Sequence, residues 1–178
     1  KADFLGHSMG GKIAMWLALN RPGLVNALLI ADISPLSYSH NFDHTIQSLR
    51  QLDLINLANR KQAEHQLADD IPDLNYRQFL LQNLQLEQGA YQWRINLDYF
   101  QSNAHHIVAF PELSGLKPYN KPVLFLSGEQ SYYIRREVIF AQFPHAEIVE
   151  IPGTGHWLHV EAPQLFIKHC EDWLNQSL

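Results

Sequence analysis

A serine lies between two glycines near the start of the chain, in the pattern Gly6-x-Ser8-x-Gly10. Apolar residues come before this pattern and a stretch rich in small residues follows it, which predicts a strand, a sharp turn and then a helix over 9–20. In that setting the serine hydroxyl stands exposed at the end of a sheet, where it can act as a nucleophile. Glycine is expected at both flanking positions because a Cβ there would collide where the incoming strand meets the outgoing helix.

The backbone N–H of Met9 would lie at the amino end of the predicted helix, where partial positive charge favours a developing oxyanion. The same stretch also fits a phosphate-binding loop in part, because Gly6, Gly11 and Lys12 have the spacing of that motif. That loop needs Ser or Thr after the lysine to reach magnesium, but Ile13 occupies the position, so we expect Lys12 to be solvated instead. A glycine-rich turn with an incidental serine is the third interpretation, and a histidine and an acid further along the chain decide among them.

An acid and a histidine both follow predicted strands. A continuous apolar run, typical of a strand covered on both faces, has Asp32 at its carboxyl end. Two more strands are predicted over 122–128 and 146–151, and His156 lies in the loop after the last. Strands alternating with helices predict a parallel α/β sheet, whose functional groups gather at the carboxyl ends of the strands. Ser8, Asp32 and His156 then come in the chain order expected of a hydrolase built on such a sheet.

The middle of the chain, residues 36–118, is rich in Gln, Asn, Leu and His and differs from the rest. Its pattern predicts several short helices, the first capped by Asp43 and the third carrying Leu84, followed by a short extended piece. No strand typical of a parallel sheet interrupts this segment. We therefore expect a helical lid inserted between two parts of one core, residues 1–35 and 119–178.

Composition limits the classes of partner. A formal charge of −5 without a basic cluster argues against nucleic acids and anionic membranes, and no apolar run is long enough to span a bilayer. Cys170 is the only cysteine, which excludes an internal disulfide and suits a reducing cytoplasm. The paired histidines lack a convergent set of cysteines or carboxylates, so we expect no metal, and no other cofactor is indicated.

Three stretches stand out: Gly6-His7-Ser8-Met9-Gly10-Gly11-Lys12, Asp32-Ile33-Ser34-Pro35 and Gly153-x-Gly155-His156-Trp157-x-His159-x-Glu161-x-Pro163. Together they resemble the α/β-hydrolase superfamily, and closely its YbfF-type esterases. The resemblance covers essentially the whole chain, including the lid, and the combination is far more specific than the serine pattern alone. It implies a serine esterase or thioesterase acting on short to medium acyl chains through an acyl-serine intermediate.

The acid position departs from the common pattern of the superfamily. Most members carry the acid three residues after the glycine that ends the third of these strands, and here Ser131 occupies that position. The YbfF-like group takes the acid from the preceding strand, which implies Asp32, with Ser131 as a hydrogen-bond partner of His156. Glu129 is a weaker alternative, and a turn-forming role before Ser-Pro is the non-catalytic interpretation of Asp32.

The remaining expectations concern the surroundings of Ser8. His7 and Trp157 flank the catalytic positions and are candidates for lining an acyl pocket, although either side chain is equally suited to simple packing. The second oxyanion donor normally comes from a His-Gly loop after an earlier strand, which these 178 residues lack. We therefore expect a natural amino-terminal portion to precede Lys1 and the chain alone to be inactive.

The expected partner is a small-molecule acyl ester or thioester, and the oligomeric state is left open. Two alternatives stay beside this interpretation. One is a C–C bond hydrolase or lyase that uses the same three residues, and the other is a non-catalytic binding scaffold with this fold.

Overall fold

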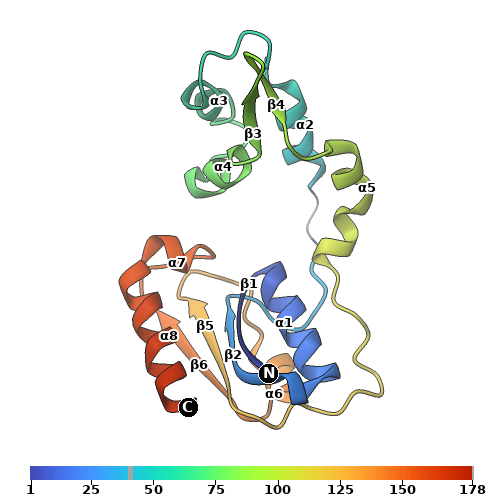
Figure 1. Ribbon diagram of the computed structural model, residues 1–178, viewed down its shortest axis with the longest axis vertical. Helices are drawn as coiled ribbons and strands as arrows, with labels where there is room; N and C mark the ends of the chain where they lie inside the picture. Colours follow the sequence, from blue (N-terminus) through green and yellow to red (C-terminus); the bar gives the residue numbers. More distant parts are fainter. Residues whose placement is uncertain (40–41, 178) are drawn as a thin grey trace. The chain divides into compact units, whose positions relative to one another are not determined.

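The computed structural model describes residues 1–39 and 42–177 (Figure 1). The chain divides into two compact units, one formed by Lys1–Tyr38 with Ala109–Leu178 and the other by Ser39–Val108. Residues 40 and 41, inside the expected insertion, and residue 178, at the end of the expected carboxyl-terminal part, lie outside the described residues.

The first unit is built on a four-stranded sheet with the strand order β1-β2-β5-β6, in which every pairing is parallel. The parallel α/β class predicted from the sequence is therefore confirmed. Its strands are β1 (Ala2–His7), β2 (Val25–Ala31), β5 (Val123–Gly128) and β6 (Ala146–Ile151). Its helices are α1 (Met9–Asn20), the short 3-10 helix η1 (Pro22–Leu24), α6 (Arg136–Gln142), α7 (Leu158–Glu161) and α8 (Pro163–Ser177).

The central strands β2 and β5 are mostly apolar, as expected of strands whose two faces are both covered by helices (Figure 1). In β2, Leu28 and Ile30 enter a core shared with α1 and α6, whereas Leu29 and Ala31 enter a second core shared with α7 and α8. Each of these four side chains is at most 2% exposed. Burying a side chain of the size of leucine or isoleucine contributes about 1.5–3 kcal/mol, so the apolar run in the sequence is what holds the sheet between its helices.

The register of the strands brings their carboxyl ends together. His7 at the end of β1 pairs with Ala31 at the end of β2, and Ala31 pairs with Leu126 of β5. Gly128 at the end of β5 pairs with Ile151 at the end of β6. The segments that follow these strands therefore leave the sheet at the same edge.

The second unit has a core of its own, formed by its helices and by an antiparallel hairpin. Gln88 and Gly89 form the hairpin turn with φ of 50° and 84°, and two consecutive residues with positive φ are typical of a type I′ turn. The elements of this unit are α2 (Asp43–Gln51), α3 (Arg60–Gln66), α4 (Leu74–Leu81), β3 (Leu84–Glu87), β4 (Ala90–Trp93) and α5 (Leu97–Val108).

Two local predictions for this segment were wrong. Asp43 does not cap α2: Phe42 is the N-cap, and Asp43 is the first helical residue, accepting a hydrogen bond from Gln101 on α5. Leu84 lies in β3 rather than in a helix, because it pairs with Trp93 across the hairpin and is fully buried there. Tertiary pairing has overridden the helical spacing that suggested the assignment.

The second unit is also shorter than the expected insertion. Residues 109–118 belong to the first unit, because Phe110, Leu113 and Leu116 pack against its core. A lid role for Ser39–Val108 stays a prediction.

Within the described part of the chain, no helix combines the length and the hydropathy needed to cross a bilayer.

Candidate active site

Ser8 occupies the sharp turn between β1 and α1. Its φ of 53° and ψ of −120° put it in a conformation that residues other than glycine seldom adopt, at a cost of about 1–3 kcal/mol. Two backbone hydrogen bonds hold it there: Ser8 N–H donates to Ala31 O at 3.1 Å, and Ser8 O accepts from Lys12 N–H at 3.1 Å. The turn therefore places the serine side chain at the edge of the sheet where the carboxyl ends of the strands meet.

The close approach of strand and helix involves a different glycine pair from the one predicted. A Cβ on Gly6 would lie 2.4 Å from Gly10 O, which explains glycine at that position. A Cβ on Gly10 would meet no atom within 4 Å, so the prediction of a collision there is wrong. Gly11 is the second tight position, since a Cβ would lie 2.5 Å from Ile33 Cγ2 and 2.9 Å from Gly6 O.

The structure brings Ser8, Asp32 and His156 together at the sheet edge. Nε2 of His156 lies 3.1 Å from Ser8 Oγ, and its Nδ1 lies 2.7 Å from Asp32 Oδ2. Because the carboxylate accepts, Nδ1 carries the proton and Nε2 is free to accept from the serine hydroxyl. This arrangement can take a proton from Ser8 and hold it on the imidazole while the resulting positive charge faces a carboxylate.

Asp32 is fully buried and follows β2 with a φ of 51°. A buried carboxylate is costly unless it is hydrogen-bonded, and this one has partners on both oxygens. Oδ1 accepts from the backbone N–H of Gly128 at 3.1 Å, and Oδ2 accepts from Ser131 Oγ at 2.5 Å as well as from His156. Ser131 was predicted to bind the imidazole, but its hydroxyl instead donates to the acid that lies against the imidazole.

The loop that leads to the histidine is fixed by two other carboxylates. Oε2 of Glu129, the weaker candidate for the acid, accepts from Gly153 N–H at 2.6 Å, and Oε2 of Glu161 accepts from Gly155 N–H at 2.6 Å. A Cβ on Gly128 would lie 2.1 Å from Gly155 O, so the loop passes directly over the end of β5. The carboxylate of Glu129 therefore binds the backbone of this loop and does not face the His156 ring.

Tyr133 contacts the imidazole and was missed by the sequence analysis. Its ring centroid lies 4.2 Å from that of His156. Its carbonyl oxygen accepts from Ser34 Oγ at 2.8 Å and from Tyr38 Oη at 2.6 Å, and Ser34 Oγ also accepts from Arg135 N–H at 2.7 Å. Pairs this far apart in the chain leave no local pattern, so nothing in the sequence identified Tyr133.

His7 and Trp157 lie beside the same imidazole. Nε2 of His7 donates to the backbone oxygen of His156 at 2.8 Å, and the two rings are 4.6 Å apart between centroids. Burial lowers the pKa of His7 to about 4. The ring of Trp157 lies 5.7 Å from that of His7. Their role as pocket lining stays a prediction.

Met9 is the first residue of α1 and is about half exposed. The N–H groups in the first turn of a helix have no intrahelical carbonyl to donate to, so they are available to an anion. The expected oxyanion donor therefore lies at the amino end of the helix that follows Ser8.

Lys12 was expected in solvent, but it is only 7% exposed. Its Nζ donates to Ala109 O at 3.1 Å and lies 4.8 Å from the centroid of the Tyr38 ring. Burial lowers the pKa of Lys12 to about 8. The prediction of a solvated lysine is wrong. The ammonium group of Lys12 donates to a carbonyl of its own chain, whereas a phosphate-binding loop needs that group to bind phosphate. The structure therefore argues against the phosphate-loop interpretation.

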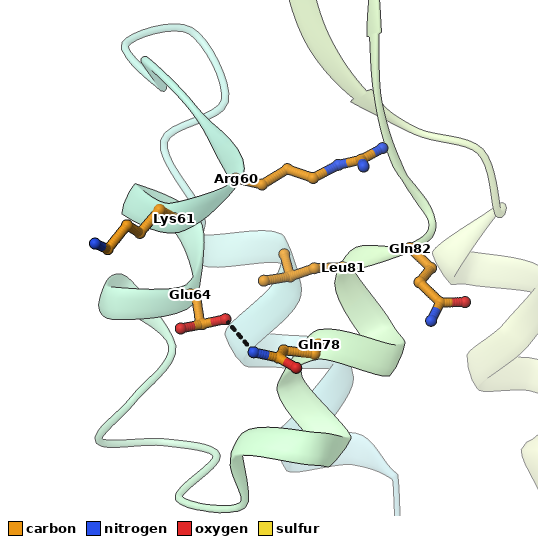
Figure 2. A pocket seen from close by; sticks show the side chains of 6 residues that line it. All are labelled: Arg60, Lys61, Glu64, Gln78, Leu81 and Gln82. Carbon is orange, nitrogen blue, oxygen red and sulfur yellow. Dashed lines mark hydrogen bonds between the residues drawn. The ribbon is translucent and has the colours of Figure 1, made fainter. Parts of the chain in front are cut away.

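The second unit carries a hollow of about 260 Å³, but it contains none of the predicted site residues (Figure 2). Three of its polar side chains already have partners: Gln78 donates to Glu64 at 3.1 Å, and the guanidinium of Arg60 donates to Leu84 O. Among the described residues there is also no cluster of three or more His, Cys, Asp or Glu that could hold a metal ion. The hollow is lined by Arg60, Lys61, Glu64, Gln78, Leu81 and Gln82.

Known proteins resemble this chain in sequence and in structure. Residues 1–169 match the family model described as "Alpha/beta hydrolase family". The sn-1-specific diacylglycerol lipase ABHD11 of Danio rerio is 41% identical over 177 residues, which cover 94% of this chain and 55% of that protein. Esterase YbfF of Escherichia coli (strain K12) is 30% identical over 179 residues, which cover 98% of this chain and 67% of that protein.

A solved structure described as "Marine microorganism esterase" is 37% identical, with a TM-score of 0.86 over 96% of this chain and 69% of that one. The chain spans about half the length of the ABHD11 relatives, between 54% and 58% in the four species compared. The parallel sheet, the match of a family model over 1–169 and these identities lead to one conclusion. The chain belongs to the alpha/beta hydrolase family.

Proposed function

We propose that this chain carries the nucleophile, base and acid of a serine hydrolase that cleaves carboxylic esters. The observation that carries the proposal is the pair of hydrogen bonds joining Ser8 Oγ, the His156 ring and Asp32 Oδ2, at 3.1 Å and 2.7 Å. The similarity to proteins named as esterases and as a lipase supports the same chemistry.

The reaction would proceed in two acyl-transfer steps. Ser8 Oγ attacks the ester carbonyl carbon while Nε2 of His156 takes the hydroxyl proton, which gives a tetrahedral oxyanion. The imidazolium then donates that proton to the departing alcohol oxygen, and the acyl group remains on Ser8 as an ester. In the second step His156 takes a proton from water, the water oxygen attacks the acyl carbon, and the carboxylic acid leaves as the serine hydroxyl is restored.

The other groups of the site stabilise the intermediates of these two steps and form no covalent bond to the substrate. Asp32 keeps the Nδ1 proton in place and faces the charge that forms on His156. Ser131 and the Gly128 amide hold the carboxylate, and the Met9 N–H stabilises the oxyanion. The two donors to Asp32 are in place before the reaction begins, so little reorganisation of the carboxylate is needed as charge develops on His156.

For the substrate we propose small esters of short to medium acyl chains, with thioesters as a second class that the same attack would cleave. The preference for these acyl lengths rests on the resemblance to YbfF-type esterases. Comparing p-nitrophenyl esters of increasing length with matched acyl thioesters measures both preferences.

The central test is the exchange Ser8→Ala in the protein as it occurs naturally. We expect covalent labelling by a fluorophosphonate and colour release from p-nitrophenyl butyrate to be lost, because no nucleophile remains. Ser102→Ala is the matched control, since Ser102 is an exposed serine on α5 whose hydroxyl donates to a backbone oxygen, Asp98 O, at 2.9 Å. Labelling that survives Ser8→Ala would contradict the proposal.

A further inference from the structure

His7 makes a bond that neither the resemblance nor the proposed reaction uses. It is the last residue of β1, directly before the serine, and its Nε2 lies 2.8 Å from the backbone oxygen of His156. A carbonyl oxygen only accepts hydrogen bonds, so Nε2 of His7 must carry a proton and donate it. The bond joins the strand that presents the nucleophile to the loop that presents the base, across 149 positions of sequence.

The ring of His7 is packed among other aromatic rings. Its centroid lies 4.6 Å from that of His156, 4.5 Å from that of His159 and 5.7 Å from that of Trp157. A ring held on several sides in this way has little freedom to turn. The donor on Nε2 is therefore fixed in direction as well as in distance.

The charge state of His7 suits this position. The charged or titratable groups that act on it are His156 and His159, which disfavour its protonation, and Asp32, which favours it. Burial is the largest effect, and together these lower the pKa of His7 to about 4. His7 is therefore neutral at neutral pH, and no positive charge lies beside the imidazolium that forms during acyl transfer.

We propose that His7 is a positioning residue for the hydrolysis, whose Nε2–H holds the main chain of His156 where that ring reaches Ser8. The inference rests on the proposed function and adds a role to it, since the sequence suggested only pocket lining for His7. A pocket residue would act on substrate binding, whereas a residue that sets the distance between base and nucleophile acts on kcat.

Two substitutions of equal length separate the hydrogen bond from the bulk of the side chain. His7→Gln retains an amide N–H with similar reach, and His7→Met has the same length without a donor. His145→Met is the control, because His145 is an exposed histidine in the turn before β6. The variants are made in the protein as it occurs naturally, and kcat and KM are measured with p-nitrophenyl butyrate after thermal melting has shown that each variant is folded.

We expect His7→Met to lower kcat by about 10–100-fold with KM within about twofold, because small displacements of a catalytic group cost rates of that order. His7→Gln should restore kcat to within about fivefold of the native value. A loss confined to KM, or an equal loss of kcat in the two variants, would overturn the role. If His7→Met does not fold, the glutamine variant decides alone, and a fall of kcat beyond about fivefold overturns the inference.

Ser8→Ala separates this inference from the proposed function. If Ser8→Ala keeps its esterase activity, the proposed function fails and the role of His7 fails with it. If Ser8→Ala is inactive while His7→Met keeps the native kcat, only the role of His7 is overturned.

Discussion

Asp32 receives hydrogen bonds from a backbone amide at the end of β5, from a hydroxyl in the loop after β5 and from an imidazole in the loop after β6. The first two, from Gly128 and Ser131, leave the carboxylate little freedom to turn away from the ring. Ser131, at the position where the common pattern led us to look for an acid, therefore hydrogen-bonds to Asp32, the acid that we propose.

Substitutions at Asp32 and at Ser131 should lower kcat by different amounts. Asp32→Asn removes the charge that faces the imidazolium and favours the wrong tautomer of His156, so we expect kcat to fall by roughly 10³–10⁴-fold. Ser131→Ala removes one hydrogen bond to a charged acceptor, worth about 1.5–3 kcal/mol, so the fall should not exceed roughly 10–100-fold. Steady-state kinetics with a p-nitrophenyl ester measures both. The control is Glu129→Gln, and a larger loss there than for Asp32→Asn would refute the assignment of the acid.

The histidines beside the site should make the protein less stable in mild acid. The pKa of His7 is about 4 in the folded chain and about 6.5 unfolded, so between these values the unfolded chain binds more protons. Stability is then greatest above about pH 6.5 and declines as the pH falls toward 4. Burial also lowers the pKa of His159, which acts in the same direction. Urea midpoints at pH 4 to 7 should show this decline, and His7→Gln should make it shallower; an unchanged slope in that variant would contradict the account.

At the scale of elements, the junction of β1 and α1 depends on backbone contact. Gly6 and Gly11 are the positions where the strand and the helix touch, with Ile33 packed against the second of them. Gly10, which completes the pattern around Ser8, is sterically open. The motif therefore contains glycines with different physical roles.

Alanine substitutions distinguish these roles. Gly11→Ala forces a methyl group against Ile33 and should destabilise the protein by about 1–3 kcal/mol. Gly10→Ala meets no atom and replaces glycine inside a helix, so stability should be unchanged or rise by up to about 1 kcal/mol. Urea unfolding of both variants provides the comparison, and equal destabilisation by the two would show that the close approach is wrongly placed.

At the scale of the whole molecule, the two units have separate cores. The clusters that hold the sheet contain only residues of Lys1–Tyr38 and Ala109–Leu178, and the cluster of the second unit contains only residues of Ser39–Val108. Ser37 Oγ accepts from Phe110 N–H at 2.8 Å and donates to Phe110 O at 3.3 Å. The two segments of the first unit that flank Ser39–Val108 are thus hydrogen-bonded to each other within the first unit.

Replacing residues 39–108 with a short Gly-Ser linker, in the protein as it occurs naturally, should therefore leave the first unit folded. We expect a cooperative melting transition, an α/β circular dichroism spectrum and continued fluorophosphonate labelling of Ser8, because no core residue of that unit has been removed. Acyl-length preference should change if the excised unit acts as a lid. A shortened protein without a melting transition would show that the two units fold only together.

Local features of the sequence were enough for the fold class and for the candidate residues. Continuous apolar runs predict strands covered on both faces, and the residues that follow such strands, Ser8, Asp32 and His156 among them, must leave the sheet at one edge. These conclusions need only the types and order of residues near each other in the chain, which is why they could be drawn before the structure was known.

Contacts between distant residues were predicted only in part, and the tertiary structure decided the rest. Asp32 faces the His156 ring, as the resemblance implied, whereas Ser131 bonds to Asp32 rather than to the ring and Glu129 bonds to the loop backbone. The bond from His7 to the His156 backbone likewise has no local signal, since its partners are 149 positions apart. Such pairings depend on how the strand ends and loops pack in three dimensions, and residue type and local spacing carry no record of that.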